Sequence, residues 1–212
     1  MSYKIPTDLK DITCLQWYKM QEAIKLIDNE PLLKATLISN ILDITLDKVV
    51  KFKMSDINSF YEDIMILIEQ KPELSHFTID GLNFGFIPNL EQMSGAEFID
   101  AESYFDNDIF SFMAVVYRPI KKEIGKSYSI EKYKGADKYR ELMAKAPASA
   151  YVSARFFFLN LVTDLISVIP SYILKNLTTS EVALLERNGV GMSQLTNLLE
   201  ATDLNIKALL VN

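Results

Sequence analysis

The most apolar stretch of the sequence places the first limit on the fold. It covers about 14 residues, from Phe156 to Ile169, and Pro170 follows it. A helix that crosses a bilayer needs roughly 20 predominantly apolar residues, and here Asn160 and Asp164 interrupt the stretch with polar groups that are costly in lipid. We therefore expect a helix that is buried by protein and does not span a membrane.

This stretch forms the second half of a longer predicted helix. Pro147 can open that helix, and the pattern continues to about residue 174, which gives a length of roughly 40 Å at about 1.5 Å per residue. A helix that is apolar nearly all round is typical of the centre of a bundle. The sequence thus predicts a mainly α fold, a helical bundle around this one long apolar helix of the C-terminal half. Short helices are predicted to follow at 179–188, 193–200 and 205–210.

The first third of the chain predicts four helices, at 14–28, 31–43, 46–52 and 56–70. Thr13 and Gln16 have the spacing of a capping box, and Pro31 fits the first turn of the second helix. Thr45 and Ser55 are the expected caps of the third and fourth helices. Further helices are predicted at 94–104, 108–117 and 136–145.

Two segments between these helices predict β structure. Residues 76–87 alternate between apolar and polar around Asp80-Gly81, a pair that tolerates the positive φ angles of a tight hairpin turn. Residues 120–133 predict a second hairpin, or an extended surface arm or loop at 118–134, within a single mostly helical domain of residues 1–212. A lone hairpin is marginal in water, so its apolar face must pack on helices or on another chain. The candidate protein-contact residues are Phe77, Ile79, Phe84, Phe86 and Ile87 in the first segment and Tyr128 and Tyr133 in the second.

Charge and cysteine content exclude several classes of protein. The net charge is -6 and the isoelectric point is near 4.9, which disfavours direct binding of nucleic acid because that role gathers Lys and Arg against phosphates. A single cysteine, Cys14, allows no intramolecular disulfide, so a reducing compartment is the default expectation. The N-terminus lacks the apolar stretch of a signal peptide.

Residues with catalytic or metal-binding chemistry are few. His76 is the single histidine, and one imidazole does not make a typical multi-histidine metal site. Cys14 lies at the start of a predicted helix, where the helix dipole could lower its pKa, but a thiol at such a position more often packs. One acidic cluster could bind a hard cation, although its spacing is not that of an EF-hand. Its members are Asp100, Glu102, Asp106 and Asp108. We predict no catalytic residue, no cofactor and no metal site.

Several segments resemble a family of small proteins of tailed bacteriophages, including crAss-like phages and their relatives. The resemblance covers about residues 10–165 and leaves out the tail after Val168. It rests on a helical N-terminal third and on the segments FGFIPNLEQMSGAEFID (84–100), MAVVYRPI (113–120), YRELM (139–143) and ARFFFLN (154–160). None of these segments is a catalytic signature. The resemblance implies a phage origin and gives no active-site residues.

The resemblance implies a non-enzymatic protein that works by protein–protein binding. The first hypothesis is a virion structural component, in the tail, the connector or the particle interior, bound to other phage structural proteins or to copies of itself. The second is a soluble tail-assembly chaperone that leaves before the particle is complete. A small metal-dependent enzyme that uses the acidic cluster is the third. The expected location is the virion, or the cytoplasm of the infected bacterium during assembly.

Overall fold

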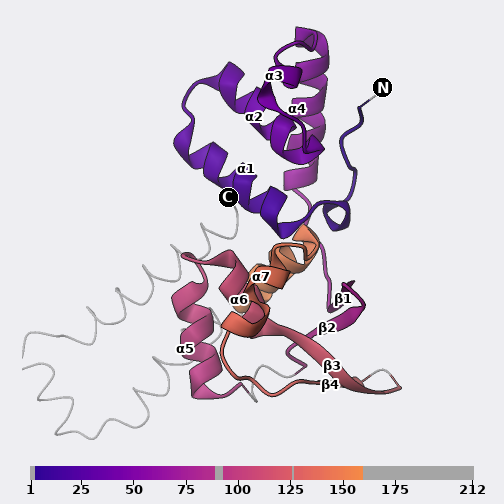
Figure 1. Ribbon diagram of the computed structural model, residues 1–212, viewed down its shortest axis with the longest axis vertical. Helices are drawn as coiled ribbons and strands as arrows, with labels where there is room; N and C mark the ends of the chain where they lie inside the picture. The colour runs from indigo at the N-terminus through magenta and orange to yellow at the C-terminus, as the bar shows by residue number, and fades with distance from the viewer. Residues whose placement is uncertain (1–2, 89–92, 126, 160–212) are drawn as a thin grey trace, which may run out of the picture. The chain divides into compact units, whose positions relative to one another are not determined.

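The computed structural model of the protein describes residues 3–88, 93–125 and 127–159 (Figure 1). By its internal contacts the chain divides into two compact units, Met1–Ala154 and Arg155–Asn212. All labelled helices and strands belong to the first unit. The predicted helix beyond residue 159, the three tail helices and Asp164 lie outside the described residues. That residues 1–212 form a single domain stays a prediction.

The first unit combines helices with one sheet. Its N-terminal part contains η1 (Leu9–Asp11), α1 (Cys14–Leu26), α2 (Glu30–Leu42), α3 (Leu46–Val49) and α4 (Met54–Ile68). The remainder contains β1 (His76–Ile79), β2 (Leu82–Phe86), α5 (Gly95–Tyr104), α6 (Ile109–Val116), β3 (Tyr117–Ile124), β4 (Ser127–Ile130) and α7 (Asp137–Met143). A further helix begins at residue 148 in this unit, and the helical residues that the structure describes continue to 159, in the second unit. Figure 1 shows α1–α4 grouped above α5–α7 and the sheet.

The N-terminal helices begin at capping residues because the first backbone N–H groups of a helix need acceptors. Thr13 and Gln16 form the predicted capping box of α1. Asn29 caps α2 through its side chain, with Pro31 in the first turn. The prediction that Ser55 caps the fourth helix is wrong, since α4 already begins at Met54.

The N-terminal segment is fastened to residues far along the chain. The Cys14 amide donates to the Ala146 carbonyl at 2.7 Å, and the Ala148 amide donates to the Ile12 carbonyl at 2.8 Å. These bonds place the start of α1 beside the start of the helix at 148–159. Both are bonds between backbone groups, so the pattern of side chains in the sequence does not predict them.

The four strands form one antiparallel sheet in the order β1-β2-β3-β4. The β1–β2 hairpin turns at Asp80 and Gly81, whose φ angles are 48° and 79°. The two residues thus adopt the positive φ angles expected of a tight hairpin turn. Strand β3 pairs with β2 on one side, with Tyr117 opposite Phe86, and with β4 on the other.

The predicted bundle around one long apolar helix is therefore wrong. Strand β3 joins the two hairpin segments into a single sheet, and the described residues form a mixture of helices and antiparallel sheet. The start of this strand was not predicted because Pro119 has no backbone N–H to donate to a neighbouring strand. Proline therefore usually marks the end of a strand or a helix. In the structure Pro119 lies opposite Phe84, near an irregularity in the β3–β4 register, and its carbonyl accepts from the Glu131 amide at 2.9 Å.

The core lies where one face of the sheet meets the helices. The ring of Phe84 is stacked on Phe77 at 5.7 Å between centroids and meets Tyr139 of α7 edge-on at 5.4 Å. Tyr117 contacts Phe77 and Phe86 in the same cluster. Aromatic pairs of this kind contribute about 0.5–1.5 kcal/mol each beyond the burial of their area. Through Tyr139 the aromatic cluster packs the sheet against α7. The other face of the sheet carries the site.

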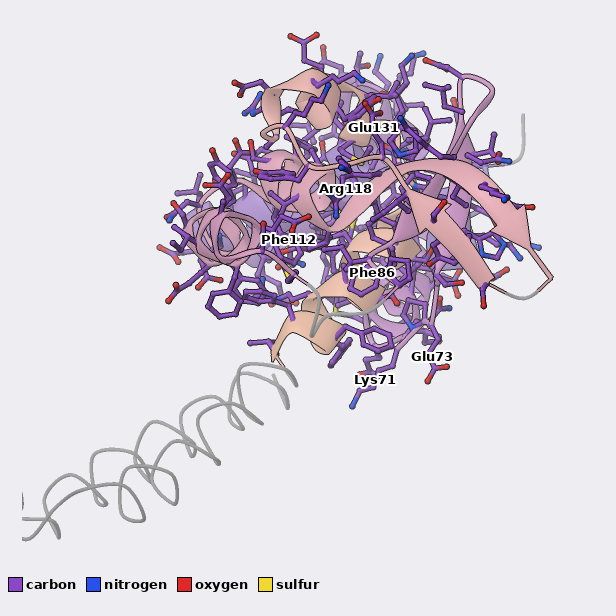
Figure 2. The ribbon with its side chains drawn as sticks, turned by 90° about the horizontal axis from the view of Figure 1, so that it is seen from below. Lys71, Glu73, Phe86, Phe112, Arg118 and Glu131 are labelled. Atoms are coloured by element: carbon purple, nitrogen blue, oxygen red, sulfur yellow. The ribbon has the colours of Figure 1, made fainter. Side chains whose placement is uncertain are left out.

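Helix α6 is the most buried of the labelled helices, with Phe112 completely inaccessible to solvent. It packs against α5 and α7. Figure 2 labels Phe112 and Phe86, two rings of this interior. Within the described residues, no helix has both the length and the hydropathy needed to cross a membrane.

Candidate functional site

The second face of the sheet is shaped by a close contact between Gly85 and Tyr128. Strand β2 has no side chain at Gly85, and the Tyr128 ring from β4 occupies the space where a Cβ atom would project. The Tyr128 hydroxyl then donates to the Phe86 carbonyl at 2.9 Å. Burial raises the pKa of Tyr128 above its ordinary value, so the hydroxyl stays protonated as a donor.

Beside this ring lies a pocket of about 600 Å³, which we call the Arg118 pocket. It is lined by residues 128–133, from β4 and the segment after it. The other lining residues that the structure describes are Ile87, Pro88, Met93, Ser94, Glu97 and Arg118. Figure 2 labels Arg118 and Glu131, which both line it. The pocket thus joins the N-terminal end of α5 to the second face of the sheet.

Glu97 joins α5 to β3 at the lining of the pocket. It is the third residue of α5 and forms a capping box with Ser94, whose amide donates to Glu97 Oε2 at 2.7 Å. Its other oxygen lies 2.6 Å from Nη2 of Arg118. Burial alone raises the pKa of Glu97, but the hydrogen bonds with Ser94 and the positive charge of Arg118 outweigh it and hold the pKa below its ordinary value. The pair is therefore ionised at neutral pH.

Arg118 is the least usual group in the pocket. Its side chain is only 8% exposed, although a charged group in the interior normally has every donor satisfied. Nη2 contacts Glu97, and the guanidinium carbon lies 5.6 Å from the centre of the Tyr133 ring. Nε is buried and has no hydrogen-bond partner among the described residues. The guanidinium therefore holds donor capacity that the described protein does not use.

Tyr133 and Glu131 are held by their own partners. The Tyr133 hydroxyl donates to Asp100 Oδ2 at 2.5 Å, and burial followed by this carboxylate raises the pKa of Tyr133. Glu131 accepts from the Tyr139 hydroxyl at 2.6 Å and from Lys138 Nζ at 2.9 Å. The hydrogen bonds from Tyr139 and then Lys138 lower the pKa of Glu131 to about 2. These three contacts fix the segment after β4, which lines the pocket.

The structure distributes the predicted contact residues between the core and the pocket. Five of them are buried, with exposed fractions no greater than 9%, namely Phe77, Ile79, Phe84, Phe86 and Ile87. The first four pack in the interior of the first unit and form no surface there. Ile87, Tyr128 and Tyr133 line the Arg118 pocket, and the two tyrosines are half-buried.

Sequence reasoning missed Arg118, Glu97 and Ser94 as site residues. The Ser94-x-x-Glu97 spacing is the signal of a capping box, which indicates a helix start and says nothing of a partner for the carboxylate. Arg118 stands before Pro119, a pair that indicated only the end of a helix. Their meeting depends on the pairing of β3 with β2, which no local pattern reveals.

The acidic cluster is partly occupied by structural contacts. Asp108 caps α6 by accepting from the Phe110 and Ser111 amides, and it pairs with Arg140 Nε at 2.8 Å. Burial raises the pKa of Asp108, but the bonds from Arg140 and Ser111 outweigh it and lower the pKa. Across the part of the chain that the structure describes, no group of three or more His, Cys, Asp or Glu side chains is placed to hold a metal ion.

The remaining reactive side chains lie away from the Arg118 pocket. His76 is exposed in β1, with Nδ1 at 3.0 Å from the Ser75 hydroxyl. Cys14 is completely buried, and its thiol lies 3.5 Å from the Pro147 carbonyl. Neither residue lines the pocket.

Comparisons with known proteins give no family for this chain. No protein-family model matches it, and neither a curated protein nor a solved structure matches it.

Proposed function

We propose that the protein acts by binding another polypeptide in the Arg118 pocket, as a non-enzymatic structural component of a bacteriophage virion. The single observation that carries the binding role is the composition of the pocket. Tyrosine, methionine and arginine are the residue types that protein interfaces favour, and Tyr128, Tyr133, Met93 and Arg118 all line it. The phage setting rests on the resemblance of the sequence.

The second candidate is a tail-assembly chaperone, and a different observation favours it. The N-terminal helices carry large apolar side chains that reach far into solvent. Leu26 is 76% exposed, Ile66 65%, and Val50 and Met54 60% each. Exposed side chains of this kind suit a protein that shields apolar surface of a partner and then leaves.

Quantitative mass spectrometry of purified intact phage particles and of the infected-cell lysate separates these two roles. A fixed copy number per particle supports the structural component. Abundance in the lysate without incorporation supports the chaperone. Absence from every phage fraction overturns the phage setting and leaves the binding role to be tested separately.

Two tryptophan variants in one strand test the binding role. Ser129 lines the pocket and is exposed, so Ser129→Trp fills the site from its rim. Ser127 is also exposed in β4 but does not line the pocket, so Ser127→Trp is the matched control. Partners crosslinked to the wild-type protein and to Ser127→Trp should be lost from Ser129→Trp. Equal capture by all three proteins overturns the pocket as the binding site.

A further inference from the structure

We propose that the Arg118 pocket recognises an uncharged, extended polypeptide segment, whose backbone carbonyl oxygens accept the hydrogen bonds that the Arg118 guanidinium leaves unmade. This inference rests on the proposed binding role and adds the chemistry of the ligand. It excludes an anionic ligand, which a buried arginine would at first sight suggest.

The unused donors of Arg118 require an acceptor. A guanidinium has five N–H donors, and the closest contact of the ion pair with Glu97 is made by Nη2. Nε is buried without a hydrogen-bond partner among the described residues. A buried donor left unpaired costs about 1–3 kcal/mol, so a ligand that supplies an oxygen here gains more than it would at an exposed arginine.

The charge of the pocket decides which oxygen it accepts. Among the described residues, its lining contains two basic side chains, Arg118 and Lys132, and two acidic ones, Glu97 and Glu131. The carboxylate of Glu97 already neutralises the charge of the Arg118 guanidinium. Glu97 and Glu131 both remain ionised at neutral pH. A carboxylate or phosphate that approached Arg118 would also approach these two carboxylates. A neutral acceptor meets the same donors without that repulsion, and the peptide carbonyl is the commonest neutral acceptor that a protein partner presents.

The surroundings of Arg118 suit an extended chain. Among the described strands, β4 stands at an edge of the sheet and pairs only with β3. Its residues Tyr128, Ser129 and Ile130 line the pocket. An extended peptide can add to such an edge through backbone hydrogen bonds, with alternate side chains entering nearby pockets. Ile87, Pro88 and Met93 supply apolar surface for those side chains.

The test selects ligands from a random library of displayed peptides on the full-length protein, with Ser129→Trp used to remove peptides that bind elsewhere. One selected peptide is then made with blocked ends, and again with a single Glu or a single Lys added. The uncharged peptide should bind tightest, and raising NaCl from about 50 mM to about 500 mM should change its affinity less than about twofold, because no net charge is neutralised.

A direct readout comes from the Nε–H signal of Arg118 in a ¹⁵N-labelled sample, which is easy to follow because the chain has four arginines. This signal should shift when the uncharged peptide is added to the wild-type protein and stay in place with Ser129→Trp. Selected peptides that share an Asp, a Glu or a free carboxylate, or affinity that falls about tenfold with salt, overturn the neutral ligand. An Nε–H signal that stays in place while a selected peptide binds the wild-type protein overturns the proposed site itself.

Discussion

A Cβ atom on Gly85 would lie 2.5 Å from Cε2 of Tyr128 and 3.0 Å from Cγ1 of Ile120. Real Cβ atoms do not approach ring carbons so closely, so Gly85→Ala must displace the Tyr128 ring or bend β2. Overpacking of this kind costs about 1–3 kcal/mol. Urea denaturation should show a loss of that size in the free energy of unfolding, with Tyr128 moved from its place beside the Arg118 pocket.

Gly95→Ala is the matched control for this prediction. Gly95 is the first residue of α5, and a Cβ atom added there would meet nothing within 4 Å. Its effect on stability should stay within about 0.5 kcal/mol. If Gly85→Ala remains equally destabilising in a Tyr128→Ala background, the clash with the ring is not the cause.

The hydroxyl of Tyr117 gives a second prediction about the core. It lies 2.5 Å from the Leu74 carbonyl and 3.2 Å from the Ala150 carbonyl, and Tyr117 is fully buried. Tyr117→Phe keeps the ring but removes the donor that serves both carbonyls. We expect the free energy of unfolding to fall by about 1–3 kcal/mol in chemical denaturation.

Tyr18→Phe also removes a tyrosine hydroxyl, but from a residue that is 39% exposed and so open to water. This control should change stability by less than about 0.5 kcal/mol. Equal effects of the two substitutions would show that the Tyr117 hydroxyl has no special structural role.

The sequence predicted local structure far better than it predicted how the elements pack together. The Thr13–Gln16 capping box and the Asp80-Gly81 turn depend on residues close together in the chain, and both are present. The sheet depends on β3, a strand that contains Pro119 and follows α6 without a loop. A residue that lacks a backbone donor argues against a strand, so the local signal pointed away from the fold.

The site was harder to foresee than the fold. Tyr128 and Tyr133 were predicted as contact residues and do line the pocket, but Arg118 and Glu97 meet only through the register of β2 and β3. Hairpin rings such as Phe84 were expected to contact a partner and are buried in the core. The sequence pattern of an apolar strand face is the same whether helices of its own chain or another chain cover that face.

The Glu97–Arg118 ion pair predicts a particular dependence of stability on pH. The pKa of Glu97 in the folded protein lies below its ordinary value near 4.5, so the unfolded chain binds the proton more readily. The stabilisation is therefore fully present above about pH 5 and is lost as the pH falls through the folded pKa. Glu97→Gln leaves Arg118 buried without a counter-charge and should lower stability at pH 7 by about 3 kcal/mol.

The difference between wild type and Glu97→Gln should shrink as the pH is lowered, because the wild-type carboxyl then becomes protonated as well. Denaturation measured from about pH 7 down to about pH 3 follows this change. Glu102→Gln, at an exposed position on the same helix, is the control and should leave stability close to that of wild type. A Glu97→Gln deficit that is constant over the whole range would contradict the assignment to this ion pair.

Two opposing effects act on the pKa of the Cys14 thiol, the helix dipole and burial, and burial is the larger. It is the first residue of α1, where the helix dipole favours a thiolate, yet its side chain is completely inaccessible to solvent. Burial raises the pKa of the thiol, and a hydrogen bond with the Tyr151 backbone offsets only part of that rise. A thiol-specific reagent should therefore modify Cys14 only when the protein unfolds, at a rate that increases with denaturant. Ser55→Cys in a Cys14→Ala background provides an exposed thiol for comparison and should react at least about 100-fold faster under native conditions. Rapid labelling of Cys14 in the native wild-type protein would instead show that the start of α1 opens readily.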